Sequence, residues 1–333
     1  MNPEQRPSTY PVVETFPDGR KPLHELYDVY FQLLDHGWTA ECIAVQEYTN
    51  PDGKTHTLPI YGFLSPKKTS EPEPACWTIA DIHGEEPAPV QASADEIETI
   101  QALPEQGIPV VAIFVANPAG YCRDFRYIDK RRSPIIGRPG KSVGDAEHLL
   151  PHIPNKHLPR KQHPSSPIAD ALTSWVLKKS ALYYPLFVAN HHEDEIDFFH
   201  LHHDRRYYYN YVYGNPLVLD QITPTIKHTL EQSGHTLQKK GRTRHGNLII
   251  NGFVHNVHDG SIDELLASPT YFIDGQQYHK KPALAVVTIE TIIDPKKKQT
   301  MKERARIHRD IIQQYSFLYH AVHNFSLNSV VGI

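Results

Sequence analysis

Histidine and glutamate side chains stand where the chain could hold a metal ion. An apolar run, IADI, leads into the stretch HGEE, which begins at His83 and ends at Glu86, and a later run, LFVAN, leads into His191 and His192. Catalytic zinc typically has three protein ligands and an open position, and two His with one Glu is a common set. We therefore expect His83, Glu86 and one later His to bind one Zn²⁺ ion. His192 is preferred over His191.

Another apolar run, VVTI, leads directly into the carboxylate residue Glu290. A carboxylate is costly there unless it faces a polar cleft or an ion. Beside a zinc site, Glu290 is predicted to be the general base that takes a proton from zinc-bound water, whose pKa is lowered. Without a metal site, a surface residue at a strand end would be the simpler interpretation.

The elements that must position these residues are short apolar runs, predicted to be buried strands at Trp77–Ile82, Val110–Ala116, Leu186–Asn190 and Leu284–Ile289. Helices are expected between and after them, at 93–103, 167–180, 219–233 and 300–323. This alternation predicts an α/β fold with helices on both faces of the sheet. Ligands of such sheets bind beyond the carboxyl ends of the strands, where distant residues meet.

The amino-terminal part is predicted to be an extended arm at 1–20, a helix at 22–36 and a hairpin that turns at Asn50-Pro51-Asp52-Gly53. The stretch 129–166 is expected to be a long functional loop. Nothing divides residues 21–333 into separate domains, so we expect one catalytic domain there.

Composition excludes several classes of partner. The net charge of -4 and the pI of about 6.6 give no basic surface for nucleic acid. The sequence contains neither a signal peptide nor an apolar run long enough to span a membrane, so a cytoplasmic location with no membrane partner is expected. The 3 cysteines suit a reducing compartment and are expected to be packing residues. The oligomeric state is left open.

The order of these motifs resembles the zinc metallocarboxypeptidase family, including its murein peptide amidase-like and aspartoacylase/succinylglutamate desuccinylase-like relatives. HxxE, the stretch NPAG, a basic stretch, a late His and a late Glu follow one another over residues 57–295. The resemblance implies zinc ligands at His83, Glu86 and His192, and a general base at Glu290. It also implies a mixed, mostly parallel sheet of about eight strands sandwiched by helices.

The resemblance further implies an arginine that stabilises the oxyanion. The spacing in murein peptide amidase-like members points to Arg126, which we prefer, and the spacing in pancreatic-type enzymes points to Arg132, a candidate substrate-binding residue. The family motif GVDLNR corresponds to the stretch from Ser142 to His148, in which Asp145 would accept a hydrogen bond from the ring of His83. The Asn-Arg pair that grips a substrate carboxylate in the family is missing from this stretch.

The expected activity is zinc-dependent hydrolysis of an amide bond in a peptide, for example a cell-wall peptide. N-acyl amino acids are the alternative substrate, since HGEEPAP resembles the HGNE-type motif of the deacylases. A non-catalytic metal-binding protein is a third hypothesis, disfavoured because the ligands and the base are all present.

Overall fold

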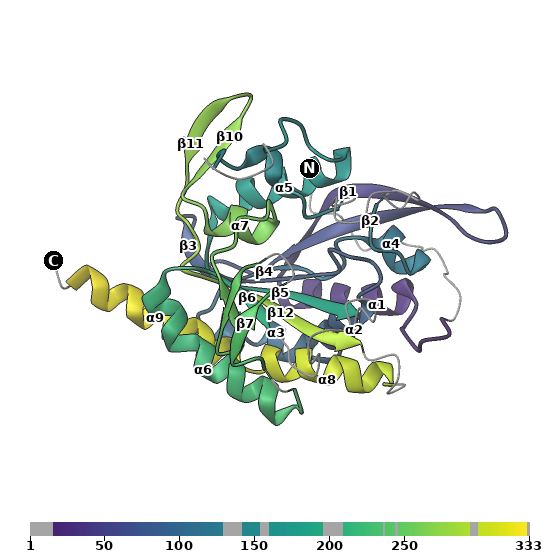
Figure 1. Cartoon of the computed structure of the whole chain (residues 1–333). Coiled ribbons are helices and arrows are strands. Elements are labelled where there is room, and N and C mark those ends of the chain that lie inside the picture. Colours follow the sequence, from purple (N-terminus) through teal and green to yellow (C-terminus); the bar gives the residue numbers. More distant parts are fainter. Residues whose placement is uncertain are drawn as a thin grey trace.

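The computed structural model describes residues 16–128, 142–153, 160–195, 209–235, 237–243, 246–293 and 299–331. Its centre is a ten-stranded sheet (Figure 1). In spatial order the strands are β1 (Thr39–Thr49), β2 (Thr55–Leu64), β4 (Val110–Ile113), β3 (Glu73–Ala80), β5 (Tyr183–Glu195), β12 (Ala285–Ile293), β6 (Asn210–Gly214), β9 (Phe253–His255), β8 (Leu248–Ile250) and β7 (Lys240–Arg242). A separate two-stranded sheet joins β10 (Thr270–Ile273) and β11 (Gln276–His279).

The strands at the centre of the sheet, β4, β3, β5 and β12, are parallel, and they are the ones predicted from the apolar runs. Among the remaining neighbouring pairs of this sheet, only β6 and β9 are parallel. The α/β class and the mixed sheet are thus confirmed. The expectation of about eight strands, mostly parallel, is wrong, because three-residue strands such as β7, β8 and β9 are too short to show any periodicity in the sequence.

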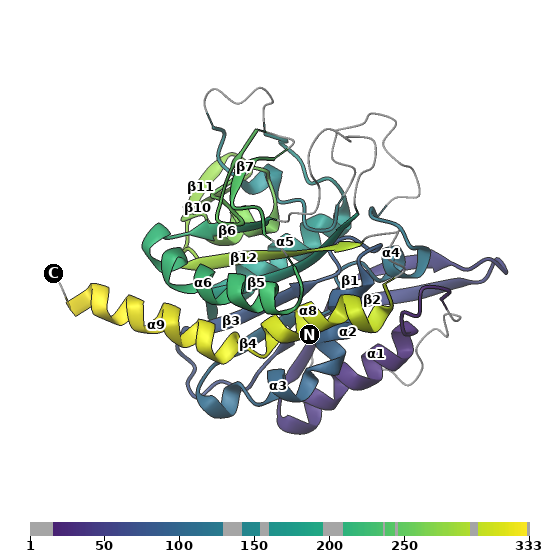
Figure 2. The ribbon, with the colours of Figure 1, turned by 60° about the horizontal axis from the view of Figure 1, so that its bottom comes forward.

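Helices cover both faces of the sheet (Figures 1 and 2). One face carries α1 (Leu23–Tyr30), α2 (Pro87–Asp95), α3 (Ile97–Gln101), α6 (Pro216–Gln232), α8 (Met301–Ile312) and α9 (Tyr315–Val331). The other face carries α5 (Pro167–Ser180) and α7 (Ile262–Ala267), while α4 (Pro118–Arg123) follows the central strand β4. Short 3₁₀ segments are η1 (Phe31–His36), η2 (Pro104–Gln106) and η3 (Glu147–Leu149).

One predicted helix matches the structure, and two others correspond to pairs of shorter helices. The prediction of 167–180 matches α5, whose first turn is capped by Ser166. The prediction of 93–103 is wrong, because two helices, α2 and α3, occupy 87–101 instead. The helix expected at 300–323 is two helices, α8 and α9.

Alternation along the central strands decides which side chains reach each face. On β5, Phe187 and Ala189 belong to the apolar cluster under α6, α8 and α9, whereas Val188 belongs to the cluster under α5 and α7. On β12, Val287 belongs to the first of these clusters and Val286 to the second. Successive side chains of a strand point to opposite faces. From Phe187 to the end of β5, and along β12, the even-numbered residues therefore face α5 and α7.

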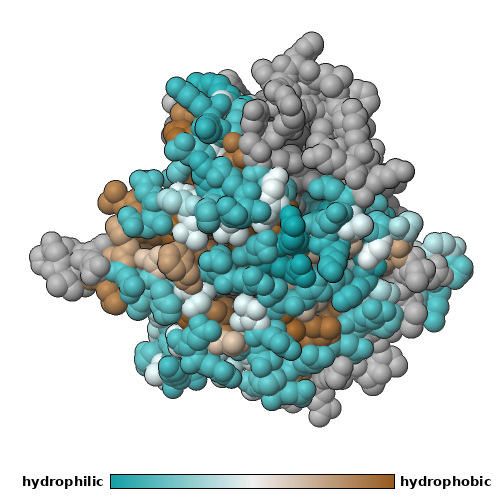
Figure 3. Space-filling model, turned by 90° about the horizontal axis from the view of Figure 1, so that it is seen from below, coloured by the Kyte–Doolittle hydropathy of each residue, from teal (hydrophilic) through white to brown (hydrophobic). Residues whose placement is uncertain are grey.

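The outer surface of the α6–α8–α9 layer is mostly hydrophilic, with small apolar areas (Figure 3). Leu217 of α6 and Phe317 of α9 are among its exposed apolar side chains. In the described part of the chain, no helix combines the length and the apolar character needed to cross a membrane.

Candidate metal centre

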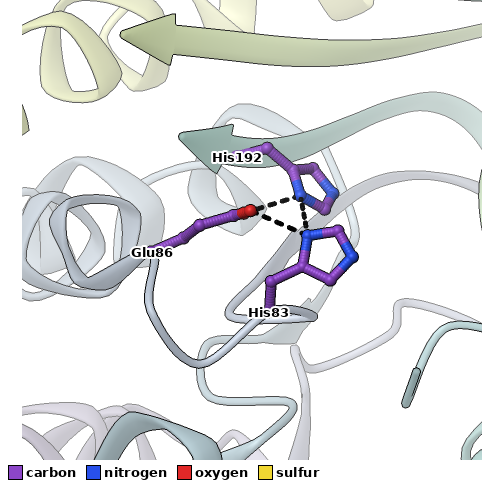
Figure 4. Close-up of side chains that lie close together, drawn as sticks. All are labelled: His83, Glu86 and His192. Carbon is purple, nitrogen blue, oxygen red and sulfur yellow. Dashed lines mark hydrogen bonds and ion pairs between the residues drawn. The ribbon is translucent and has the colours of Figure 1, made fainter. Parts of the chain in front are cut away.

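The side chains of His83, Glu86 and His192 point toward one another (Figure 4). The two Glu86 oxygens lie 2.8 Å from Nδ1 of His83 and 2.8 Å from Nδ1 of His192. The two Nδ1 atoms are 3.2 Å apart, and the possible ligand atoms all lie within 4.8 Å of one another. All three side chains are largely buried. The structure thus brings together the three residues that the sequence suggested as metal ligands.

The donor atoms fit a zinc ion. Two ligating nitrogens at zinc–nitrogen distances of about 2.0–2.1 Å and a tetrahedral angle lie about 3.3 Å apart, close to the spacing of the two Nδ1 atoms. Two imidazoles and a carboxylate are also a common donor set of catalytic zinc. The Glu86 oxygens lie closer to the rings, at hydrogen-bonding distance.

Two neighbouring central strands position these ligands. His83 and Glu86 lie on the loop after β3, in a turn where the Glu86 N–H donates to the His83 carbonyl at 3.1 Å, and Pro87 then begins α2. His192 lies on β5, which pairs in parallel with β3 up to Ala80 opposite His191. The prediction that β5 ends before the His pair is wrong, because β5 pairs with β12 as far as Glu195.

Strand alternation separates the two neighbouring histidines. His192 shares its sheet face with Val188 and reaches Glu86. His191 faces the helical layer opposite, where its Nδ1 lies 3.0 Å from Nδ1 of His308 and its Nε2 lies 2.6 Å from the Tyr315 hydroxyl. The geometry therefore selects His192 rather than His191 for the cluster.

The charges of the three residues depend on one another. Burial and the nearby Arg126 lower the pKa of His83 to about 4. Burial opposes a charge on His192 too, but the Glu86 carboxylate outweighs it and raises the pKa of His192 to about 9. Burial likewise opposes the charge of Glu86, yet the two rings hold its pKa well below the usual range. Glu86 is thus an anion at neutral pH, as metal ligation requires.

Glu290 lies beside this cluster. It is directly opposite His192 in the parallel pairing of β12 with β5, and both are even-numbered residues that face α5 and α7. Its backbone N–H donates to Oδ1 of Asn210 at 2.9 Å. Burial, together with repulsion from Glu86, raises the pKa of Glu290 to about 8. As with His192, the strand continues beyond the residue, so Glu290 is not at a strand end as predicted.

Of the two candidate arginines, Arg126 reaches the cluster. Its Nη1 lies 3.0 Å from Oε1 of Glu85 and 3.0 Å from Oε1 of Glu86. Arg132 lies outside the described residues. Glu85 was not predicted to take part in the site, although this residue stands inside the HGEE stretch. Its Oε2 is buried and has no hydrogen-bond partner among the described residues.

Asp145 is not placed against His83. Its carboxylate contacts Nζ of Lys161 and accepts from the N–H of Glu147 at 3.2 Å. Within the described residues no hydrogen bond joins Asp145 to the ring of His83, so the predicted contact is not formed in this structure. The Asp145 carboxylate pairs with Lys161 instead of with the imidazole of His83, its predicted partner.

A row of buried polar residues, not predicted from the sequence, continues from the cluster along the same sheet face. Asn190 of β5 donates from Nδ2 to both oxygens of Asp263 at 3.0 Å, and the Thr288 hydroxyl of β12 donates to Asp263 at 2.7 Å. Asp263 also favours the charged form of His192. The sequence did contain a signal for this row, because the polar residues Asn190 and Thr288 stand two positions before His192 and Glu290.

Solved structures with a similar architecture include proteins described as a metallopeptidase candidate and a metallo-carboxypeptidase. A candidate metallopeptidase from Shewanella amazonensis is 14% identical, with a TM-score of 0.62 over 89% of this chain and 91% of that one. A Pseudomonas aeruginosa metallo-carboxypeptidase in complex with (2-guanidinoethylmercapto)succinic acid is 15% identical, with a TM-score of 0.51 over 91% and 70%. Bovine thrombin-activatable fibrinolysis inhibitor, in complex with tick carboxypeptidase inhibitor, is 12% identical, with a TM-score of 0.53 over 92% and 99%.

No family model matches the sequence, and no curated protein matches it either. The shared architecture nevertheless confirms the predicted zinc carboxypeptidase-like fold.

Proposed function

We propose that the protein is a zinc-dependent hydrolase that cleaves an amide bond in a peptide substrate. The observation that carries this proposal is the convergence of His83, Glu86 and His192, with all donor atoms within 4.8 Å, beside the carboxylate of Glu290. The carboxypeptidase-like fold supports it, because similar structures include metallo-carboxypeptidases.

The three ligand residues would hold one zinc ion. When bound, zinc acts as a Lewis acid that polarises a carbonyl group and lowers the pKa of water. Glu86 contributes the negative charge of the set, and the two imidazoles contribute neutral nitrogens. The loop after β3 and the strand β5 hold these donors from two directions.

Glu290 is the proposed general base. Its carboxylate takes a proton from the attacking water and passes that proton to the leaving amine. A raised pKa suits this role, because a base with a pKa near the working pH accepts and returns a proton readily. The pairing of β12 with β5 holds the backbone of Glu290 opposite that of His192.

Arg126 is proposed to stabilise the negative charge that develops on the substrate carbonyl oxygen. Its guanidinium lies 3.0 Å from Oε1 of Glu86, so it places a fixed positive charge next to the ligand set. The opposing carboxylates, Glu85 and Glu86, keep this side chain in one orientation.

A peptide is the preferred substrate class. The bovine structure holds tick carboxypeptidase inhibitor, and the Pseudomonas structure holds (2-guanidinoethylmercapto)succinic acid. We expect peptide-like ligands here. Cell-wall peptides belong to the same class. N-acyl amino acids are the alternative class to be tested beside them.

The test combines metal analysis with activity assays. Purified protein is analysed for bound zinc and incubated with a peptide library, murein fragments and N-acyl amino acids, and the products are identified by mass spectrometry. Glu290→Gln is expected to keep the zinc and to lower the turnover number by about 100- to 10,000-fold. Zinc binding with no hydrolysis of any substrate would favour a metal-binding protein instead.

The ligand assignment has a matched control in the neighbouring histidine. His192→Ala is expected to abolish stoichiometric zinc binding, since it removes one of three donors. His191→Ala removes the same atoms one position earlier on the opposite face of β5, and it is expected to retain the zinc. Full zinc occupancy in His192→Ala would disprove the site.

A further inference from the structure

The loop that carries His83 and Glu86 is joined to residues that precede the first helix. Arg20 lies just before α1, and only 5% of its surface is exposed. Of the predicted amino-terminal arm, residues 16–20 belong to the described part of the chain. The Arg20 guanidinium lies near the rings of Phe16 and Tyr121, 5.2 and 5.3 Å from their centroids.

The donors of Arg20 have two kinds of partner. Nε donates to Oδ2 of Asp18 at 2.8 Å, and Nη2 donates to Oδ1 of Asp124. Nη1 donates to two backbone carbonyls, that of Tyr121 at 2.9 Å and that of Gly84 at 3.5 Å. The two carboxylates neutralise the charge of the guanidinium and orient it. The guanidinium in turn fixes the two backbone carbonyls by hydrogen bonds. Gly84 stands between His83 and Glu86 in the ligand loop.

The two carbonyls come from backbones that are in direct contact. A Cβ added at Gly84 would lie 2.1 Å from the carbonyl carbon of Gly120 in α4, which leaves no room for a side chain. The ligand loop therefore rests on the backbone of α4, and Arg20 donates to one carbonyl on each side of this contact. The Tyr121 hydroxyl completes the connection, because it donates to the carbonyl of Lys21 at 2.7 Å.

We propose that Arg20 is a positioning residue for the metal centre: it fixes the loop between His83 and Glu86 against α4 and so keeps both ligands aimed at the ion. This inference rests on the proposed function, because it needs a metal at the site. A planar guanidinium with several fixed donors can reach both carbonyls and both carboxylates, whereas a lysine ammonium offers a single charged point. Groups that hydrogen-bond the metal ligands themselves typically contribute 10–100-fold to metal affinity, and we expect an effect in this range from a residue that holds the loop between two ligands.

The experiment measures the zinc affinity of the full chain by competition with a chromophoric chelator. Arg20→Lys and Arg20→Met are expected to weaken zinc binding by about 10–100-fold. The cobalt-loaded proteins are compared by visible absorption, since a shifted ligand loop changes the coordination geometry that the spectrum reports. Asp124→Asn, at a largely exposed side chain that holds only one end of the guanidinium, is expected to weaken zinc binding less.

Arg160→Lys is the matched control. Arg160 is also an arginine in an ion pair, with Glu264 at 2.6 Å, and its side chain is only 10% exposed, but it does not touch the ligand loop among the described residues. It is expected to alter the melting temperature without changing zinc affinity or the cobalt spectrum.

The outcomes separate the two proposals. A wild-type protein that binds no zinc overturns the proposed function. A wild-type protein that binds zinc, with unchanged affinity and spectrum in the folded Arg20 variants, overturns only the role of Arg20. Where those variants do not fold, unchanged affinity in Asp124→Asn overturns it.

Discussion

The buried ion pair between Glu193 and Arg304, next to the metal centre, leads to a specific prediction about the free energy of unfolding. Glu193 of β5 follows His192 but faces α8, and its side chain is 0% exposed. Its carboxylate accepts from Nε and Nη2 of Arg304, both at 2.8 Å, and from the N–H of Ala88 at 2.9 Å. Two of its three hydrogen bonds therefore depend on Arg304.

Arg304→Met removes the charge and keeps most of the apolar stem. The carboxylate would then be buried with one donor left, and breaking a buried pair in this way costs about 3–5 kcal/mol. We expect that loss in the free energy of unfolding near neutral pH. The double variant with Glu193→Gln should recover most of it, because the amide oxygen can still accept from Ala88 and no buried charge remains.

The loss should depend on pH in a defined direction. Burial raises the pKa of Glu193, although Arg304 opposes this, so removal of Arg304 raises it further. A raised pKa means that the folded state holds the proton more tightly than the unfolded state. The cost of the bare carboxylate is therefore fully present above the folded pKa and declines to zero as the pH falls from the folded pKa to the lower, unfolded pKa.

The assay is urea unfolding followed by circular dichroism, with a chelator present so that metal binding does not contribute. Arg306→Met, at an exposed arginine on the same helix, is the control, expected to change stability by no more than about 1 kcal/mol. A loss below about 1 kcal/mol in Arg304→Met would refute the reasoning. So would a loss that is larger at acid pH than near pH 8.

Three further predictions concern the ligand loop and its surroundings. Gly84→Ala forces a Cβ against the backbone of Gly120 and should cost about 1–3 kcal/mol in the free energy of unfolding, with weaker zinc binding; an unchanged melting curve would contradict the close contact. Asn117→Ala removes the cap of α4, which accepts from Gly120 at 3.1 Å, and should cost about 1 kcal/mol in urea unfolding. Zinc binding at neutral pH should release between one and two protons per ion, because His192, with its pKa of about 9, and Glu290, with its pKa of about 8, hold protons without the metal and His83 does not. Calorimetry in buffers of different ionisation enthalpy measures the release, and a value near zero would be inconsistent with these charge states.

The sequence was sufficient to predict the central strands of the sheet and the residues that converge beside them. The apolar runs mark the parallel strands β4, β3, β5 and β12 because such strands are buried on both faces. Three of the residues that follow or end these runs, His83, Glu86 and His192, are those that converge in the structure. Where β5 and β12 end was not predictable, because their polar ends resemble loops until the pairing of the two strands is known.

Residues that contact backbone groups far away in the chain could not be predicted from the sequence either. Arg20 contacts carbonyls that stand 64 and 101 positions later in the chain, and no local pattern encodes such contacts. The prediction for Asp145 relied on its place in a motif, but the nearby Lys161 competes for its carboxylate. Composition and periodicity identify elements, whereas these partners follow from tertiary packing.

The separation of the ligands along the chain has a consequence for folding. His83 and His192 are 109 positions apart, and they meet only because β3 and β5 are neighbours in the sheet. Closing a flexible loop of that length costs on the order of 4 kcal/mol in chain entropy, so the unfolded chain cannot gather the ligands cheaply. An ion bound there would act as a late cross-link between two halves of the chain: it would follow strand pairing rather than guide it, and would then slow the separation of the halves.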